Sequence, residues 1–266
     1  MLGEEKIMKN IYKQEMLFPA AMAEVTHREY GMLFYNKACP LSHDTNHAVI
    51  TNLNCDIDFA LKDITSFYTS RKIVPRVYFG FVPGELDILK PFLKKHGYDL
   101  GIYEGNTFFI HENISTATPV KSMIFKRLLA PEPGIEELIR SGEDEVQEVK
   151  ESGFGGEWWV TFLYNALKVD HIHMLVGYIN DKPVTIASVN IIDGCSRIDD
   201  VKTHTDFWNR GYSGAMMDYL VKYHAKLSDN VLYLYAFNPA AIRVYEKVGF
   251  VKVENTLPMW SAWKKH

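Results

Sequence analysis

One short segment constrains the fold more than any other part of the chain. Residues 238–250 are Asn-Pro-Ala-Ala-Ile-Arg-Val-Tyr-Glu-Lys-Val-Gly-Phe and follow an apolar stretch, 231–237, that is typical of a strand. Asn238 is a favourable N-cap, and Gly249 is typical of the residue that ends a helix. Apolar side chains recur at helical spacing between the two caps: Ile242, Tyr245 and Val248. The segment therefore predicts a short helix that packs one stripe, including a phenol, against the core.

Length, composition and charge limit the class of protein. The chain has 266 residues, which suits one large domain or two modest ones. Hydrophobic residues make up 47% and charged residues 23%, as in ordinary soluble globular proteins. The formal net charge of −4 gives no support for nucleic acid or an anionic membrane as the main partner. No run approaches the roughly 18 uninterrupted apolar residues of a transmembrane helix.

The cysteines and the first residues indicate a cytoplasmic protein. Cys39, Cys55 and Cys195 are an odd, widely spaced set without a CxxC pair, as expected for reduced thiols. The chain starts Met-Leu-Gly-Glu-Glu-Lys, and no apolar run precedes Met16. No signal peptide is therefore expected.

Helical and strand patterns alternate along the whole chain. Apolar periodicity predicts helices at about 8–22, 56–70, 85–95, 158–169 and 211–227, besides the one at 238–250. Runs of β-branched and aromatic residues predict strands near 48–53, 74–81, 98–104, 107–111, 122–129, 173–179, 184–193, 196–203, 231–237, 251–254 and 259–263. The residues Ile179-Asn180-Asp181-Lys182 are typical of a hairpin turn. This order predicts an α/β (α+β) fold with a mixed, mostly antiparallel sheet flanked by helices.

A run of serine, threonine and alanine at 113–119 predicts a linker, and we expect two domains, 1–119 and 120–266. The stretch from Leu89 to Tyr98 ends in Lys-Lys-His-Gly-Tyr, similar to the Glu-Lys-Val-Gly-Phe end of 238–250. Each stretch also follows a predicted strand. The first domain is therefore interpreted as a degenerate copy of the second.

A glycine-containing loop precedes the predicted helix at 211–227. It reads Thr203-His-Thr-Asp-Phe-Trp-Asn-Arg-Gly-Tyr-Ser-Gly-Ala215. A tight loop that aims backbone N–H groups from a helix N-terminus is a simple cradle for a pyrophosphate. The first domain has no such loop, because its strand at 48–53 runs into Asp56 and Asp58, whose carboxylates would repel phosphate.

The loop and the 238–250 segment together resemble GNAT-type N-acetyltransferases, which move an acetyl group from acetyl-CoA to an amine. The family's Asn-x-x-Ala-x-x-x-Tyr-Glu-Lys-x-Gly-Phe signature is matched by Asn238, Ala241, Tyr245, Glu246, Lys247, Gly249 and Phe250. The loop resembles the family's (Arg/Gln)-x-x-Gly-x-(Gly/Ala) motif, with Trp208, Gly211 and Ser213 in the three slots. Trp208 and Ser213 depart from the usual residues. If the motif is aligned from Arg210 to Ala215 instead, Ser213 takes the position at which the family has glycine.

The resemblance implies a GNAT-like acyltransferase fold in two tandem copies, with the active module at 120–266. Acetyl-CoA would be the cosubstrate, and a primary amine would attack it directly in a ternary complex. In such enzymes the strand before the loop and the strand after the helix splay apart, and pantetheine lies in the gap. The cofactor-binding residues that it implies are Val201, Thr203, Asn209, Arg210, Gly211, Tyr212, Ser213, Gly214 and Asn238.

The same resemblance makes Tyr245 the general acid that protonates the departing thiolate, since a phenol is neutral at pH 7. A tyrosine that only packs in the core is the alternative. Main-chain N–H groups of the splayed strand would polarise the thioester carbonyl.

Asp199 is the predicted base. It shares its side of the strand with Val201 and Thr203, whereas the adjacent Asp200 faces the other way, because successive strand residues alternate. Other candidates stay open: Glu157, His204 and a chain of waters. For either aspartate, a solvated strand residue without a catalytic role is the alternative.

Two further groups of residues, histidines and tryptophans, are of types that occur in functional sites. The histidine pairs have spacings that a metal could use, but no cysteine or carboxylate framework accompanies them, and no metal is predicted. These pairs are His43 with His47 and His171 with His173. Trp158 and Trp159 are interpreted as capping a core or lining an acceptor pocket, and the second role fits the substrate-facing helices that the family has there.

The departures at Trp208 and Ser213 keep open a second function, a catalytically inactive acyl-CoA-binding or sensor protein. The acceptor stays open among a polyamine, an aminoglycoside, an amino acid and a protein amine. The first domain is expected to shape the acceptor site or to act as a scaffold.

Overall fold

The computed structural model describes residues 2–142, 157–192 and 194–264. The chain forms two compact units. The first unit comprises Met1–Asn106 and Asn255–His266, and the second comprises Thr107–Glu254.

This division differs from the predicted domains, 1–119 and 120–266. Strand β6 (Thr107–His111) precedes the predicted linker but pairs with strands of the second unit. Strand β13 (Trp260–Lys264) ends the chain but pairs with strands of the first unit. The units thus exchange one strand each, which no local sequence pattern indicates.

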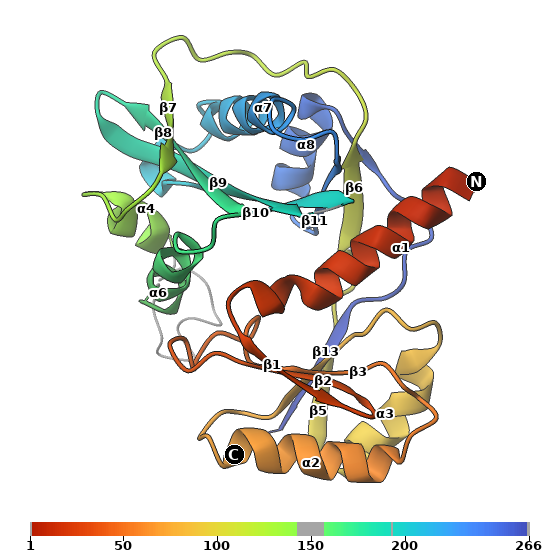
Figure 1. Ribbon diagram of the computed structural model, residues 1–266. Coiled ribbons are helices and arrows are strands. Elements are labelled where there is room, and N and C mark those ends of the chain that lie inside the picture. Colours follow the sequence, from red (N-terminus) through yellow and green to blue (C-terminus); the bar gives the residue numbers. More distant parts are fainter. Residues whose placement is uncertain (1, 143–156, 193, 265–266) are drawn as a thin grey trace. The chain divides into compact units, whose positions relative to one another are not determined.

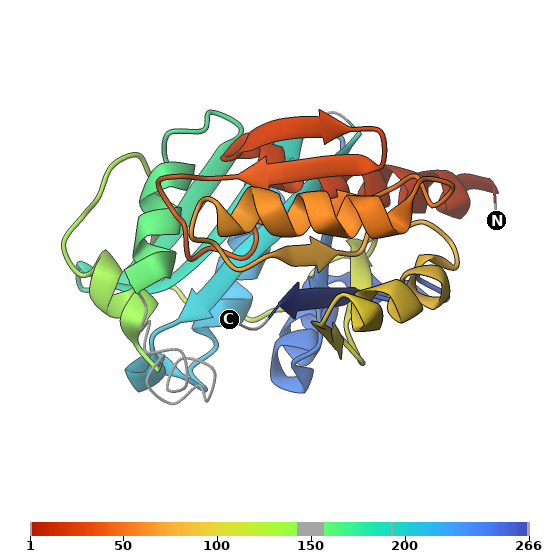
Figure 2. The same ribbon diagram turned by 90° about the horizontal axis from the view of Figure 1, so that it is seen from below.

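The first unit is a sheet with helices packed against both of its faces. Its helices are α1 (Leu2–Leu17), the short 3-10 helix η1 (Phe18–Ala21), α2 (Ile57–Thr69) and α3 (Glu85–Lys95). Its strands are β1 (Glu24–Arg28), β2 (Gly31–Tyr35), β3 (Ala48–Ile50), β4 (Arg76–Tyr78), β5 (Tyr98–Ile102) and β13, in the spatial order β1-β2-β3-β4-β13-β5. Helix α2 lies along this sheet (Figure 2) and contributes Leu61 and Ile64 to a core that α3 shares through Leu89.

The second unit has a seven-stranded sheet. Its strands are β7 (Ile124–Leu128), β8 (Ile172–Ile179), β9 (Lys182–Ile192), β10 (Cys195–Thr203), β11 (Val231–Ala236), β12 (Phe250–Lys252) and β6, in the order β12-β6-β11-β10-β9-β8-β7. Its helices are α4 (Ile135–Arg140), α6 (Glu157–Ala166), η3 (Thr205–Phe207), α7 (Tyr212–His224) and α8 (Pro239–Val248). Helices α7 and α8 lie side by side on one face of the sheet (Figure 1), where Met216, Leu220 and Val248 enter the core.

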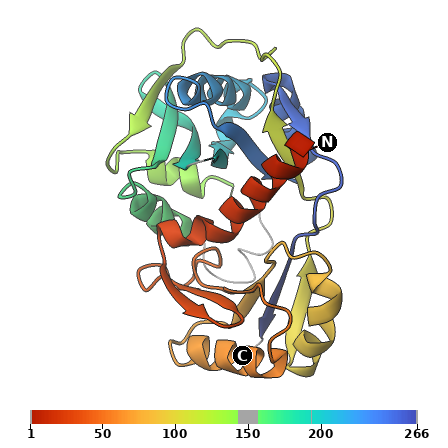
Figure 3. The same ribbon diagram turned by 45° about the vertical axis from the view of Figure 1, so that its right-hand side comes forward.

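The two units repeat one succession of elements. The order β2, β3, α2, β4, α3, β5 in the first unit corresponds to β9, β10, α7, β11, α8, β12 in the second. Strands β3 and β4 are parallel, as are β10 and β11. In the first unit β13 lies between β4 and β5 (Figure 3), and in the second β6 lies between β11 and β12. The predicted α/β (α+β) class with mostly antiparallel sheets is confirmed, and this repeat supports the tandem arrangement.

Local predictions match the structure where the sequence carries its own turn or cap. Asn180 and Asp181 have φ values of 49° and 62°, as a two-residue hairpin loop between β8 and β9 requires. The prediction at the N-terminus was less accurate: α1 ends at Leu17 rather than near residue 22, and β1 and β2 were not predicted.

Within the described residues, we find no helix with the length and apolar character needed to span a membrane. None of Cys39, Cys55 and Cys195 forms a disulfide with another described residue.

Candidate active site

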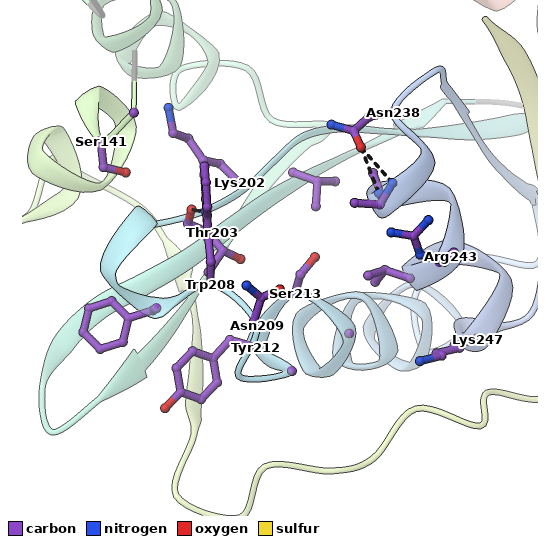
Figure 4. Close-up of a pocket in the computed structure, with 18 residues that line it drawn as sticks. Ser141, Lys202, Thr203, Trp208, Asn209, Tyr212, Ser213, Asn238, Arg243 and Lys247 are labelled. Carbon is purple, nitrogen blue, oxygen red and sulfur yellow. Dashed lines mark hydrogen bonds between the residues drawn. The ribbon is translucent and has the colours of Figure 1, made fainter. Parts of the chain in front are cut away.

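A cavity of about 650 Å³ lies in the second unit beside β10, between the N-terminal end of α7 and helix α8 (Figure 4). Eight of the nine predicted cofactor-binding residues line it: Val201, Thr203, Asn209, Gly211, Tyr212, Ser213, Gly214 and Asn238. The cavity thus joins the two sequence segments that carried the prediction.

The cavity begins where two parallel strands separate. Strands β10 and β11 pair only from Cys195 to Arg197 on β10, although β10 continues to Thr203 and β11 to Ala236. Beyond Arg197, β10 keeps only its pairing with β9. The edge of β10 that faces the gap therefore leaves Val201 and Thr203 beside the cavity.

The loop before α7 provides unpaired backbone donors. Asn209 and Gly211 have φ values of 59° and 80°, so the chain turns sharply before the helix begins at Tyr212. Gly211 is the N-cap and offers no side chain to the helix. The N–H groups of the first turn lack intrahelical partners and carry the positive end of the helix dipole. This end of α7 suits an anionic ligand.

Helix α8 forms the opposite wall and adds positive charge. The Asn238 side-chain oxygen accepts hydrogen bonds from the N–H groups of Ala240 and Ala241, at 2.8 and 3.4 Å, and so starts the helix. Arg243 and Lys247 lie one turn apart on the face toward the cavity. Neither forms an ion pair with any residue that the structure describes. Neither residue was predicted to line the cavity, although their i, i+4 spacing opposite the apolar stripe indicates that they share one face of the helix.

Two predictions for the loop need correction in detail. Arg210 is absent from the lining of this cavity, and its guanidinium lies over the Phe207 ring, 5.3 Å from the centroid. Trp208 does line the cavity, and its indole N–H donates to the Thr203 carbonyl at 2.7 Å. This main-chain oxygen, expected to contact pantetheine, thus already accepts one hydrogen bond.

A bulge in β10 changes the predicted orientation of the two aspartates. The register with β9 shifts between Asp199 and Lys202, so Asp199 does not share strand parity with Val201 and Thr203 as predicted. The Asp199 carboxylate pairs with the buried Arg197 guanidinium at 2.8 Å and accepts the Asp200 N–H at 3.0 Å. Neither aspartate lines the cavity.

Tyr245 projects from the inner face of α8 rather than into the cavity. It is 7% exposed and shares a core cluster with Ile198 of β10 and Ala236 of β11. Burial raises the pKa of Tyr245 to about 12, and the negative charge of Asp199 adds to this shift. The phenol therefore stays protonated at neutral pH.

The other predicted candidates do not form a recognisable centre. His204 is buried, with its Nδ1 atom accepting the Asp206 N–H at 3.2 Å. In the first unit, the Arg76 guanidinium lies 3.0 Å from His43 Nε2. Among the described residues there is no group of three or more His, Cys, Asp or Glu placed to hold a metal ion. The predictions for the side chains of Glu157 and Trp158 lie outside the described part of the structure.

A family model identifies the segment that builds this cavity. The model of the acetyltransferase (GNAT) family matches residues 137–250, which include β10, the loop before α7, α7 itself and α8. This segment is a GNAT acetyltransferase domain. The GNAT family uses acetyl-CoA, and the unpaired N–H groups of α7 and the two α8 cations fit the anionic end of that molecule.

Solved structures share the fold of the GNAT domain and of the first unit. A GCN5-related N-acetyltransferase from Kribbella flavida has a TM-score of 0.67 at 14% identity, over 97% of this chain and 96% of its own. A functionally unknown conserved protein from Staphylococcus epidermidis ATCC 12228 reaches 0.65 at 16% identity, over 92% and 94%. A GCN5-related N-acetyltransferase-like protein from Streptococcus suis 89/1591 reaches 0.51 at 11% identity, over 98% of both chains. At such identities the likeness establishes the fold alone. No protein of curated function matches the chain.

Asp200 gives the GNAT domain a pH-dependent stability. Burial raises its pKa to about 7, and the charge of Asp199 adds to the shift. In the unfolded chain the carboxyl group ionises near its ordinary value of about 4. Between these values the folded protein binds more protons than the unfolded chain, so the free energy of unfolding falls as the pH rises.

We expect Asp200→Asn to raise the free energy of unfolding by on the order of 1–3 kcal/mol above pH 7 and to change it little near pH 4. Asparagine tolerates the left-handed backbone of this position, φ 54°, as well as aspartate does. Urea denaturation of both proteins at pH 4.5 and pH 8 measures the difference. A gain that is the same at both pH values would contradict the assignment of the shift to this carboxyl group.

Proposed function

We propose that the protein is an acetyl-CoA-dependent N-acetyltransferase that moves the acetyl group to a primary amine by direct attack in a ternary complex. The observation that carries the proposal is the cavity where β10 separates from β11, with the open N-terminus of α7 on one side and Arg243 and Lys247 on the other. The arrangement provides an extended strand edge for an amide-containing arm and a positive end for phosphates.

The phosphate-bearing end of acetyl-CoA would lie against the first turn of α7. The N–H groups of Tyr212, Ser213 and Gly214 point from that turn, and no side chain caps them. Arg243 and Lys247 would add charge from α8. Val201 lies on the strand edge that a pantetheine arm would follow.

Removing either α8 cation should weaken CoA binding. We expect Arg243→Gln and Lys247→Gln each to raise the Kd of CoA about three- to tenfold at low salt, since partly exposed charge pairs contribute modestly. The effect should shrink as salt screens the charges. Lys252→Gln is the matched control, because Lys252 lies on β12, outside the cavity and beside Glu254. A control that weakens binding as much as the cavity variants would show that overall charge alone is responsible.

Acetyl-CoA supplies an activated thioester, and the protein would supply orientation and proton transfer. Tyr245 is proposed as the general acid, because its phenol is protonated at neutral pH and lies on the face of α8 toward β10 and β11. Among the described residues, no hydrogen-bond partner occupies its hydroxyl group. The hydroxyl group is therefore not committed to another described residue.

The first unit is proposed to act as a scaffold without a cosubstrate site. Asp56 caps α2, the counterpart of α7, and its carboxylate accepts the Phe59 N–H at 2.9 Å. Glu85 at the start of α3 is 3% exposed, and its carboxylate accepts the Gly80 N–H at 2.9 Å and the Trp260 indole N–H at 3.1 Å. The Phe59 and Gly80 N–H groups thus already donate to carboxylates and are not open to an anionic ligand.

Thiol release tests the proposed activity. The full chain is incubated with acetyl-CoA and one amine at a time: spermidine, kanamycin, lysine and a lysine-containing peptide. Release of free CoA that depends on one of these amines, with the acetylated amine detected by mass spectrometry, is the expected result. CoA binding without thiol release for any amine would favour the alternative of an inactive acyl-CoA-binding protein.

A further inference from the structure

The bulge in β10 presents an acidic side chain where this strand leaves β11. Pairing with β11 ends at Arg197, and the register with β9 shifts between Asp199 and Lys202. Asp200 lies within the bulge with a φ of 54°, a region that few residues other than glycine adopt. Bulges and left-handed residues of this kind gather at functional sites, because they aim a side chain where a regular strand would not.

Two side chains from other elements hold the Asp200 carboxyl group. The indole N–H of Trp159 on α6 donates to Oδ1 at 3.1 Å, and the Ser188 hydroxyl on β9 donates to Oδ2 at 3.0 Å. Each carboxylate oxygen can accept a further hydrogen bond. Asp200 is half-buried.

Charges of both signs surround this carboxyl group. Asp199 raises the pKa of Asp200 in addition to burial, whereas the Arg197 guanidinium and the two hydrogen bonds lower it. The Lys202 ammonium lies 4.4 Å from the centroid of the Trp159 ring. Among the described residues, the other groups that hydrogen-bond to the Asp200 carboxyl group are Ser188 and Trp159, neither of which ionises in this range.

We infer that Asp200, rather than Asp199, is the general base that accepts a proton from the ammonium group of the acceptor. In this step an N–H bond of the ammonium breaks and an O–H bond forms on the Asp200 carboxylate. The amine keeps the electron pair with which it attacks the acetyl carbon, and Asp200 later releases its proton to solvent. Asp199 is fixed by Arg197 and by the Asp200 N–H, so it holds the bulge in place. The inference rests on the proposed N-acetyltransferase activity.

The test is the pH dependence of kcat/KM for one amine of the panel, measured with the wild type and four variants. Asp200→Asn should lower kcat/KM roughly 100-fold above pH 7 and abolish the acidic limb that the carboxyl group imposes. Ser188→Ala and Trp159→Phe each remove a donor to the charged carboxylate and should move this limb upward by about 0.5 in pH. Asp199→Asn removes a like charge and should move it downward by a similar amount.

These shifts separate a base from a structural residue, because a residue that only supports the bulge would change the rate without moving the limb in opposite directions. The CoA affinity of each variant, measured by calorimetry, checks that it is folded. Loss of the limb in Asp199→Asn with its retention in Asp200→Asn would overturn the inference in favour of Asp199. The inference would also be overturned if the wild type turns over and the pH at which kcat/KM falls on the acidic side is the same in all four variants. A wild type without turnover would instead refute the proposed activity, on which the inference depends.

Discussion

Replacing the Tyr245 hydroxyl group with hydrogen is expected to lower kcat by roughly 100- to 1,000-fold, because a general acid contributes a factor of this size. The phenol is protonated at neutral pH, since burial raises its pKa to about 12. A thiolate that leaves without a proton donor is a poorer leaving group. The ring of Tyr245→Phe keeps its packing, including the contact with Phe250 at a centroid distance of 6.3 Å. Steady-state kinetics with acetyl-CoA and a reactive amine measure the loss.

Tyr219→Phe is the matched control. Tyr219 lies on α7, where its ring stacks on Phe125 at 4.4 Å and does not line the cavity. This variant should retain the wild-type kcat and the wild-type affinity for CoA. If Tyr245→Phe also retains its kcat, Tyr245 is a packing residue of the core and the general acid must be sought elsewhere.

Replacing Gly249 with alanine is expected to lower the free energy of unfolding by more than about 3 kcal/mol, because backbone strain and a steric clash add. Gly249 ends α8 with a φ of 102°, and its carbonyl accepts the N–H groups of Glu112 and Asn113. A Cβ atom at this position would lie 1.9 Å from the Asn113 carbonyl oxygen. The chain after β6 would therefore have to move away from the end of α8.

Gly97→Ala provides the comparison at the repeated position of the first unit. Gly97 follows α3 with a φ of 73°, but no atom lies within 4 Å of a Cβ atom built there. Only the cost of the left-handed backbone remains, so the free energy of unfolding is expected to fall by about 1–2 kcal/mol. Thermal and urea unfolding followed by circular dichroism compare the two variants. Equal losses would contradict the role given to the contact between Gly249 and Asn113.

Features that depend on neighbouring residues were predicted well from the sequence. Asn238 caps α8 and Gly249 ends it, as the sequence predicts, since both functions need only the local backbone. Gly211 marks the sharp turn before α7 for the same reason. The loop and the 238–250 segment therefore located the cavity.

Features that depend on distant residues were not predicted. The exchange of β6 and β13 between the units moved the domain boundary, because pairing partners more than a hundred residues apart leave no local pattern. The bulge at Asp200 places the Asp199 side chain on the other side of β10 from the one predicted. One extra residue in a strand reverses the alternation of side chains for all residues beyond it.

The start of α7 differs from the start of its counterpart in the first unit, α2. Both units place two helices against a parallel strand pair. In the first unit the Asp56 carboxylate caps α2 and accepts the Phe59 N–H, whereas the start of α7 has no side-chain cap. The same topology thus carries an uncapped helix N-terminus in the second unit and a carboxylate-capped one in the first.

Calorimetric titration of acetyl-CoA into the full chain tests the central claim most directly. We expect binding at a single site per chain, weakened by added salt and by Arg243→Gln or Lys247→Gln, since the phosphates would lie against the α7 N-terminus and the α8 cations. Binding of acetyl-CoA at two sites per chain would contradict the assignment of the first unit. No binding would contradict the cosubstrate site itself.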